Sequence, residues 1–124
     1  RWAGQYRQSG KNLGVPPYRI TEEVQKLIAD ARYWIENNIY PWDELGARFH
    51  HRLVSIHPFP NGNGRHARLL TDVLLTQHGQ KRLTWGAHLD GNLYQQSEMR
   101  AQYLQALRKA DNHSFDALII FVKS

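Results

Sequence analysis

The strongest constraint on the fold is the spacing of apolar side chains, which recur every three or four residues through much of this 124-residue chain. That spacing places them on one face of a helix, and such a face is buried against a neighbouring element. The pattern predicts helices over residues 21–36, 43–56 and 65–78. Proline or glycine follows each helix and stops it there. We therefore expect a mainly α protein.

The remaining parts of the chain are predicted to be less regular. Residues 5–18 are rich in Gly, Pro, Ser and Asn, which favours an extended, turn-rich segment or an irregular hairpin. Residues 83–85 could form a short extended piece, and Asn92 with Gln95 resembles the capping box of a further helix. Ser114 is a candidate cap for a last short helix. Without an internal repeat or a linker, residues 1–124 are expected to form a single compact domain.

Composition excludes several kinds of chemistry. The chain has no cysteine, so it can hold no disulfide, thiolate zinc site or cysteine nucleophile. Its longest apolar run, Ala117 to Val122, is far shorter than a membrane-spanning helix, and we expect a cytoplasmic protein with no membrane partner. The chain opens at Arg1 with residues that read like the end of an element already under way. We therefore expect a fragment that lacks upstream sequence.

The formal net charge of +5 favours an anionic partner. Lys and Arg are dispersed along the chain, and no nucleic-acid recognition motif accompanies them. A nucleotide is therefore a better candidate for the partner than a nucleic acid.

The segment 57–68 joins two predicted helices but is longer than a minimal turn. Gly62 and Gly64 allow the backbone to take positive φ and to approach a ligand closely. Successive N–H groups in such a turn can converge on an anion, and the helix that begins near Arg65 adds its positive end. Arg65 and Arg68 are three residues apart, so both can face one ligand. The segment predicts a phosphate cradle, with a plain interhelical turn as the alternative.

His57 immediately precedes this segment, and an imidazole can accept a proton near neutral pH. Its placement favours a catalytic role. His50 and His51 are interpreted as structural or rim residues, because adjacent positions cannot share a helical face and no zinc-binding spacing is present. Phe59 is expected to pack inward and hold the loop in place.

The loop resembles the signature of the Fic/Doc family, His-x-Phe-x-Asp/Glu-Gly-Asn-Gly-Arg-x-x-Arg. The positions that carry the resemblance are His57, Phe59, Asn61, Gly62, Asn63, Gly64, Arg65 and Arg68, of which all but Asn61 match. Residues 2–7 and 12–14 look like the flap of the family. The amino-acid sequence of the loop, together with residues 84–86, most resembles the bacterial branch labelled mobile mystery protein B.

The resemblance implies a Fic-like helical domain with a small N-terminal β-hairpin, the flap, and transfer of AMP from ATP to a Ser, Thr or Tyr hydroxyl of a target protein. His57 would take the proton from that hydroxyl. Residues Gly62, Asn63 and Gly64 would form the anion hole, and Arg65 and Arg68 would hold the β and γ phosphates. The target chain would dock along Asn12, Leu13, Gly14 and Val15.

Asn61 stands where the family has an acidic residue that binds Mg²⁺, a cation that prefers charged oxygen ligands. Three outcomes remain open. Mg²⁺ is held mainly by the triphosphate and water, or another acid such as Asp72 helps, or ATP transfer is weak or replaced by another reaction. Asp72 lies seven positions after Arg65 on the same helical face, which is far from the loop. A non-catalytic nucleotide-binding module is therefore an alternative function.

Two further comparisons with the family bear on regulation and reaction type. Many Fic proteins are silenced by a helix reading Ser/Thr-x-x-x-Glu-Gly/Asn, a toxin–antitoxin-like arrangement when a separate chain carries it. No such string occurs in these 124 residues. It would lie upstream, belong to a separate inhibitory partner, or be dispensable in this branch. A phosphotransferase of the Doc type is another alternative, although Doc proteins lack the intact Gly-Asn-Gly-Arg ending.

Overall fold

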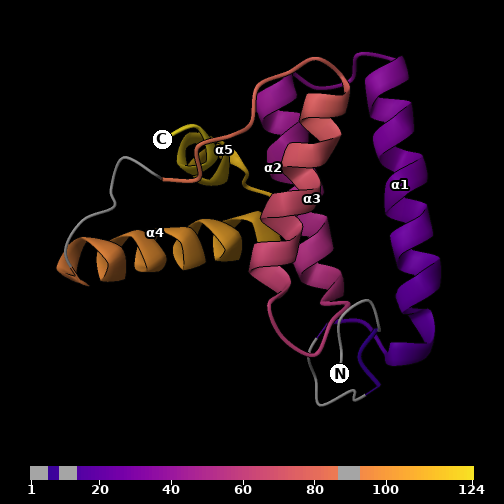
Figure 1. Ribbon diagram of the computed structural model, residues 1–124, viewed down its shortest axis with the longest axis horizontal. Helices are drawn as coiled ribbons and strands as arrows, with labels where there is room; N and C mark the ends of the chain where they lie inside the picture. The colour runs from indigo at the N-terminus through magenta and orange to yellow at the C-terminus, as the bar shows by residue number, and fades with distance from the viewer. Residues whose placement is uncertain (1–5, 9–13, 87–92) are drawn as a thin grey trace.

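The computed structural model describes residues 6–8, 14–86 and 93–124, and the described part is helical (Figure 1). The elements in chain order are a 3-10 turn η1 (Pro17–Arg19), α1 (Ile20–Glu36), α2 (Trp42–Ile56), α3 (Asn63–Gln77), α4 (Leu93–Asp111) and α5 (Asp116–Lys123). Figure 1 shows α1, α2 and α3 side by side, with α4 running crosswise to them and α5 beside it. The mainly α prediction is confirmed.

Helix α2 lies at the centre because it buries two of its faces. One core cluster joins α1, α2 and α3 and consists of Ile20, Leu27, Ala31, Phe49, Leu53, Ile56 and Ala67. The other joins α2 to the C-terminal helices and consists of Ala47, Ala106, Ala110, Leu118, Phe121 and Val122. Burial of these apolar side chains is the main source of stability. It fixes α2, whose last residue adjoins His57, on two sides.

The predicted helices occur, but α3 leaves exposed several of the apolar side chains whose spacing predicted it. Leu69, Leu70 and Val73 are 59%, 42% and 40% exposed, whereas Ala67, Thr71 and Leu75 are buried. The buried residues include small ones because α3 packs closely on α2. A Cβ on Gly46 of α2 would lie only 3.4 Å from the Thr71 methyl group. Helix α3 also begins at Asn63, two residues earlier than the sequence predicted.

Two local expectations for the C-terminal half are wrong. Ser114 does not cap the last helix, because the N-cap position of α5 is Phe115 and no side-chain cap bond forms there. Residues 83–85 are not extended throughout, because Trp85 lies in a turn with φ 51°, and they form no strand. Instead, the N–H groups of Thr84 and Trp85 donate to the Val122 carbonyl, which ties this segment to α5. Asn92 lies outside the described residues.

The N-terminal hairpin is not confirmed. No strand occurs in the segments 6–8, 14–86 and 93–124, and Pro17–Arg19 forms a 3-10 turn instead. Residues 9–13, where the turn of such a hairpin would fall, lie outside the described residues. Among the described helices, none has both the length and the apolar character needed to cross a bilayer.

Candidate functional site

His57 ends α2 and begins the glycine-rich loop. Its N–H still donates to the Leu53 carbonyl at 3.2 Å, but its backbone is left-handed, with φ 55° and ψ 60°. Pro58 follows and cannot continue the helical ladder. A left-handed conformation costs a residue with a side chain about 1–3 kcal/mol, so it persists only where neighbouring groups hold it. The orientation of the His57 imidazole therefore depends on contacts outside α2.

The side chain of Asn63 closes the loop. Its amide oxygen accepts the N–H of Phe59 at 2.9 Å, and its amide nitrogen donates to the Phe59 carbonyl at 2.8 Å. Asn63 is only 7% exposed, so both bonds are shielded from water. With its side chain used in this way, the group that Asn63 offers to an anion is its backbone N–H.

The N-terminus of α3 opens onto the loop. Gly62, the N-cap residue, has φ 72°, a conformation that glycine adopts without strain. The first backbone bond of the helix runs from the His66 N–H to the Gly62 carbonyl at 3.0 Å, so the N–H groups of residues 63–65 precede the ladder. Gly64 does not take the positive φ that the sequence suggested, because it already belongs to α3.

The two arginines of the loop lie in different environments. Arg68 is half-buried and packs over the Tyr103 ring, with its guanidinium carbon 5.9 Å from the ring centre. Arg65 is exposed. Neither takes part in an ion pair within the described residues. Both positive charges near the N-terminus of α3 thus lack an internal carboxylate partner in this part of the chain.

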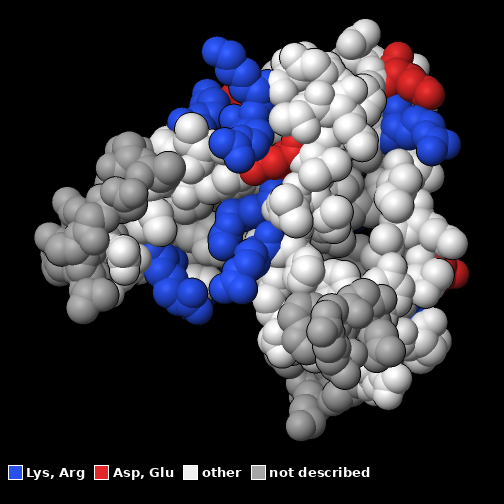
Figure 2. All heavy atoms as spheres, in the orientation of Figure 1, with Lys and Arg blue, Asp and Glu red and all other residues white. Residues whose placement is uncertain are grey.

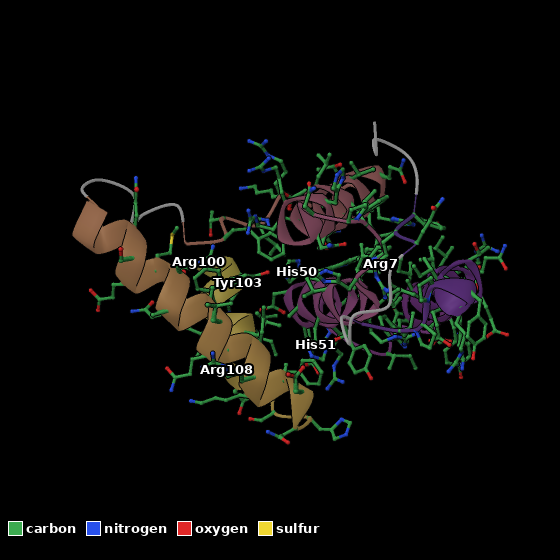
Figure 3. All side chains as sticks on the ribbon, turned by 90° about the horizontal axis from the view of Figure 1, so that it is seen from below. Arg7, His50, His51, Arg100, Tyr103 and Arg108 are labelled. Carbon is green, nitrogen blue, oxygen red and sulfur yellow. The ribbon has the colours of Figure 1, made fainter. Side chains whose placement is uncertain are left out.

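Helix α4 completes this side of the site through Tyr103. Its hydroxyl shares a 2.7 Å hydrogen bond with Nε2 of His50, and the nearby charge of Arg68 acts on it. A Cβ on Gly64 would lie 3.6 Å from the same hydroxyl. Figure 3 shows Tyr103 projecting from α4 towards His50 of α2. Tyr103 therefore lies close to Gly64 and Arg68 at the start of α3.

The ionisation of these buried groups is set by their surroundings. Burial, followed by the charge of Arg68, lowers the pKa of His50 to about 3, so this imidazole is neutral at physiological pH. Burial raises the pKa of Tyr103, so its hydroxyl keeps its proton. The structural interpretation of His50 agrees with its complete burial.

His57 itself is half-buried and lines a cavity of about 400 Å³ between α2 and α4. Burial lowers the pKa of His57, and the nearby charge of Arg7 lowers it further. The imidazole is therefore neutral at physiological pH and able to accept a proton.

The walls of this cavity combine apolar and charged side chains. The apolar ones include Leu104 and Leu107 of α4, and the polar ones include His51, Arg108 and Asp111. Nε2 of His51 lies 2.8 Å from a carboxylate oxygen of Asp111, which holds the two polar walls together. The Asp111 side chain is 63% exposed, so this cavity is a depression open to solvent.

The N-terminal segment packs against the loop and the end of α2, and its Gly14 lines the same cavity as His57. Val15 donates its N–H to the Ile56 carbonyl at 3.3 Å, and Arg7 donates its own to the Pro58 carbonyl at 2.8 Å. The Phe59 ring packs between those of Tyr6 and His66, with centres 5.8 and 4.6 Å away. Of the predicted target-docking residues, Gly14 and Val15 lie here, while Asn12 and Leu13 lie outside the described residues.

The possible metal ligands of the sequence do not gather at the loop. Asn61 is exposed. Asp72 accepts the N–H of Leu83 at 3.1 Å and the indole N–H of Trp85 at 3.1 Å, so it stabilises the segment before α4. Within the described segments, no three His, Cys, Asp or Glu side chains lie close enough together to hold a metal ion.

Positive charge gathers on the same face. Figure 2 shows Lys and Arg side chains over the region where α4 approaches α3. Arg100 of α4 lies near this site, because its charge acts on the Tyr103 hydroxyl. Anionic ligands are attracted to such a surface.

Sequence reasoning missed Arg7, Arg100 and Tyr103. Arg100 and Tyr103 are three residues apart and therefore share a face of α4, which the spacing alone could have indicated. Nothing in the local sequence showed which element that face would meet. Arg7 had no local signal, because the carbonyls it binds are about 50 residues away along the chain.

Comparison with known proteins places this chain in a family. A family model described as Fic/DOC family matches residues 1–75 of the chain. A uridine 5'-monophosphate transferase from Xanthomonas campestris pv. campestris is 39% identical over 72 residues, across 52% of this chain and 13% of that protein. A protein adenylyltransferase Fic from Nematostella vectensis is 37% identical over 82 residues, across 62% of this chain and 19% of that protein.

The fold has a solved counterpart. Fic-1 from C. elegans superimposes with a TM-score of 0.73 and 25% sequence identity, over 98% of this chain and 34% of that chain. This chain spans less than a fifth of the length of either curated relative.

Proposed function

Because this chain belongs to the Fic/DOC family, we propose that it transfers AMP from ATP to a Ser, Thr or Tyr hydroxyl of a target protein. The observation that carries the proposal is the position of His57. This neutral imidazole lines a nucleoside-sized cavity and is joined by a short loop to a helix N-terminus that bears two arginines. A base, a nucleoside site and an anion site are the parts that nucleotidyl transfer needs.

The proposed reaction is an in-line displacement at the α-phosphorus. The target hydroxyl oxygen forms the new bond to phosphorus, the bond to the oxygen that bridges the α and β phosphates breaks, and diphosphate leaves. His57 takes the proton of the attacking hydroxyl. The N–H groups of residues 62–64 would stabilise the charge on the phosphates, with Arg65 and Arg68 on the β and γ groups. Phe59 would keep the loop in its shape.

The cavity would receive the nucleoside. Its volume of about 400 Å³ lies in the range of small-molecule sites, roughly 300–1,000 Å³. The carboxylate of Asp111 can accept a hydrogen bond from the amino group of adenine or from the ring N–H of uracil, so this contact does not select the base. ATP is proposed as the substrate because several relatives are named protein adenylyltransferases. The segment with Gly14 and Val15 would lie along the docked target chain.

Mg²⁺ would be held mainly by the triphosphate and by water. The amide oxygen of Asn61 can contribute one neutral ligand, and the described residues supply no cluster of carboxylates. Mg²⁺ commonly keeps several waters and is bound together with substrate phosphates, which suits such a sparse site. When bound, the ion would neutralise charge on the leaving diphosphate.

Three finer features complete the proposal. The sequence of the loop and residues 84–86 favour the mobile mystery protein B branch of the family. Inhibition would come from a separate small chain or from a segment upstream of these residues, acting at Arg68. The reaction would take place in the cytoplasm, where ATP is supplied.

The test uses the purified chain, a lysate and ATP labelled at the α-phosphate. We expect labelled protein bands, and we expect His57→Ala to lower their intensity about 100-fold or more, in line with the loss of a general base. His78→Ala is the matched control, since His78 is exposed at the end of α3 and should leave labelling unchanged.

The alternatives give different outcomes in the same assay. A Doc-type phosphotransferase would label proteins from ATP labelled at the γ-phosphate and not from the α-labelled form. A non-catalytic module would label nothing, although millimolar ATP with Mg²⁺ would still raise its melting temperature. Labelling that survives His57→Ala would refute the role given to His57.

A further inference from the structure

Arg7 joins the N-terminal segment to the end of α2. Its guanidinium donates from Nε to the His57 carbonyl, and from one terminal nitrogen to the carbonyls of Val15 and Ile56, the latter at 3.1 Å. Its backbone N–H donates separately to Pro58. Arg7 is 5% exposed, so water competes little for these contacts. Figure 3 views the molecule from the end at which the loop lies, with Arg7 labelled.

Two of the three carbonyls that the Arg7 guanidinium contacts, those of Ile56 and His57, lie at a helix end, which leaves carbonyls without helical donors. Residues 56 and 57 lie at the end of α2, where no following turn supplies N–H groups. A positive charge at this end also interacts favourably with the helix dipole. The Arg7 guanidinium thus donates hydrogen bonds to backbone carbonyls of the turn in which His57 adopts its left-handed conformation.

The neighbouring backbone leaves little room for another arrangement. A Cβ added to Gly14 would lie 2.3 Å from the Ile56 carbonyl oxygen, 2.5 Å from Cβ of His57 and 2.9 Å from the Arg7 guanidinium. The N-terminal segment therefore touches the backbone of the turn directly. Displacement of this segment would release both the Arg7 contacts and the His57 turn.

We propose that Arg7 is a positioning residue, which orients the His57 imidazole for the transfer reaction by holding the carbonyls of residues 56 and 57. The inference rests on the proposed function only for the role of His57 as the base. Arg7 acts through His57 and through the turn, by bonds to backbone oxygens.

The charge of Arg7 acts on the same imidazole. After burial, it is the charge that lowers the pKa of His57. The other charged or titratable groups that line the cavity with His57 are His51, Arg108 and Asp111, and His51 is paired with Asp111. Removal of the guanidinium therefore changes both the orientation and the proton affinity of the base, whereas a lysine would preserve only the charge.

The experiment compares Arg7→Lys and Arg7→Gln with Arg52→Gln, which removes an arginine of α2 that pairs with Asp30 at 2.9 Å. The readouts are kcat and KM for ATP, and the pKa of His57 from NMR titration of its ring without nucleotide. In both Arg7 variants we expect kcat to fall about 10- to 100-fold with little change in KM, as for a misplaced catalytic group.

The two Arg7 variants should differ in the titration. The pKa of His57 is expected to rise in Arg7→Gln and to remain low in Arg7→Lys. Arg52→Gln is expected to change neither kcat nor the pKa of His57. Because a neutral imidazole is needed, the acid limb of the pH profile of Arg7→Gln should move to higher pH. A lower melting temperature with unchanged kcat and His57 titration would overturn the proposal and leave Arg7 a purely structural residue.

A second variant covers the case in which the Arg7 variants do not fold. Gly14→Ala keeps the guanidinium but pushes the segment away from Ile56, and Gly79→Ala is its control, with φ 77° and no atom within 4 Å of the added Cβ. Gly14→Ala should lower kcat and change the His57 titration, and Gly79→Ala should not. Equal behaviour of the two would overturn the proposal. The titration needs no turnover, so a lack of transfer activity would count against the proposed function alone.

Discussion

At the scale of single residues, the site depends on side chains whose neighbours change their chemistry. His57 and His50 are both histidines of α2 or its end, seven positions apart, yet only His57 lines the cavity. His50 is completely buried and bonded to Tyr103, and this burial, followed by the charge of Arg68, keeps it neutral without access to a ligand. The two histidines have different roles because their surroundings differ, although their residue type is the same.

Asn61 offers a direct test of the metal proposal. Asn61→Asp adds a charged oxygen at an exposed loop position, and a charged ligand binds Mg²⁺ more strongly than a neutral amide. We expect the Mg²⁺ concentration for half-maximal transfer to fall about tenfold, equivalent to roughly 1.4 kcal/mol of added binding free energy. The measurement is a Mg²⁺ titration of transfer at saturating ATP. An unchanged Mg²⁺ requirement would show that residue 61 does not face the ion, and Gln80→Glu is a control for added charge elsewhere.

At the scale of elements, the loop is a junction between α2 and α3 that is held in one conformation by its own hydrogen bonds. The amide of Asn63 bridges the backbone of Phe59, the left-handed Gly62 turns the chain, and α3 begins at once. The N–H groups at this helix start are therefore fixed relative to His57 before any ligand arrives. Such preorganisation lowers the cost of binding an anion.

The Asn63 bridge predicts a loss of stability. Asn63→Ala removes two shielded hydrogen bonds, and we expect the free energy of unfolding to fall by about 1–3 kcal/mol. Urea denaturation checks this value. The control is Asn37→Ala, in which a single bond to the Tyr33 carbonyl is lost at an exposed helix end. Comparable losses in both variants would mean that the loop does not depend on the bridge.

At the scale of the whole molecule, α4 links the site to the second core cluster. It supplies Tyr103 and the outer wall of the cavity, while its Ala106 and Ala110 pack with α5 and α2. Buried His50 meets Tyr103 at this junction. Protonation of His50 would place a charge in the centre of the fold, where no water solvates it.

Stability should therefore depend on pH. The unfolded chain binds a proton at His50 below about pH 6.5, whereas the folded chain does so only near its pKa of about 3. The unfolded state holds more protons between these values, so the free energy of unfolding falls as pH falls through this window. His50→Gln should flatten the slope, which is at most about 1.4 kcal/mol per pH unit for one group. Urea denaturation between pH 4 and 7 measures how the free energy of unfolding changes with pH, and His113→Gln, at an exposed position, is the control.

The sequence by itself determined the helical class, the five α-helices of the described segments and the loop, because these follow from local periodicity, capping residues and the backbone limits of proline and glycine. It also placed His57, Gly62 and Arg68 on one short segment, where local order ensures proximity. The sequence did not predict that leucines of α3 face outward, since the buried face of a helix depends on which neighbouring element packs against it.

Only the tertiary structure decided the partners that lie far apart in the chain. Tyr103 meets His50 and Arg68, and Arg7 meets the end of α2, across separations that no local pattern encodes. Burial and nearby charge, which lower the pKa of His57, likewise arise only when the chain is folded. Local sequence fixes which groups are available, whereas packing of distant elements sets their orientation and their charge.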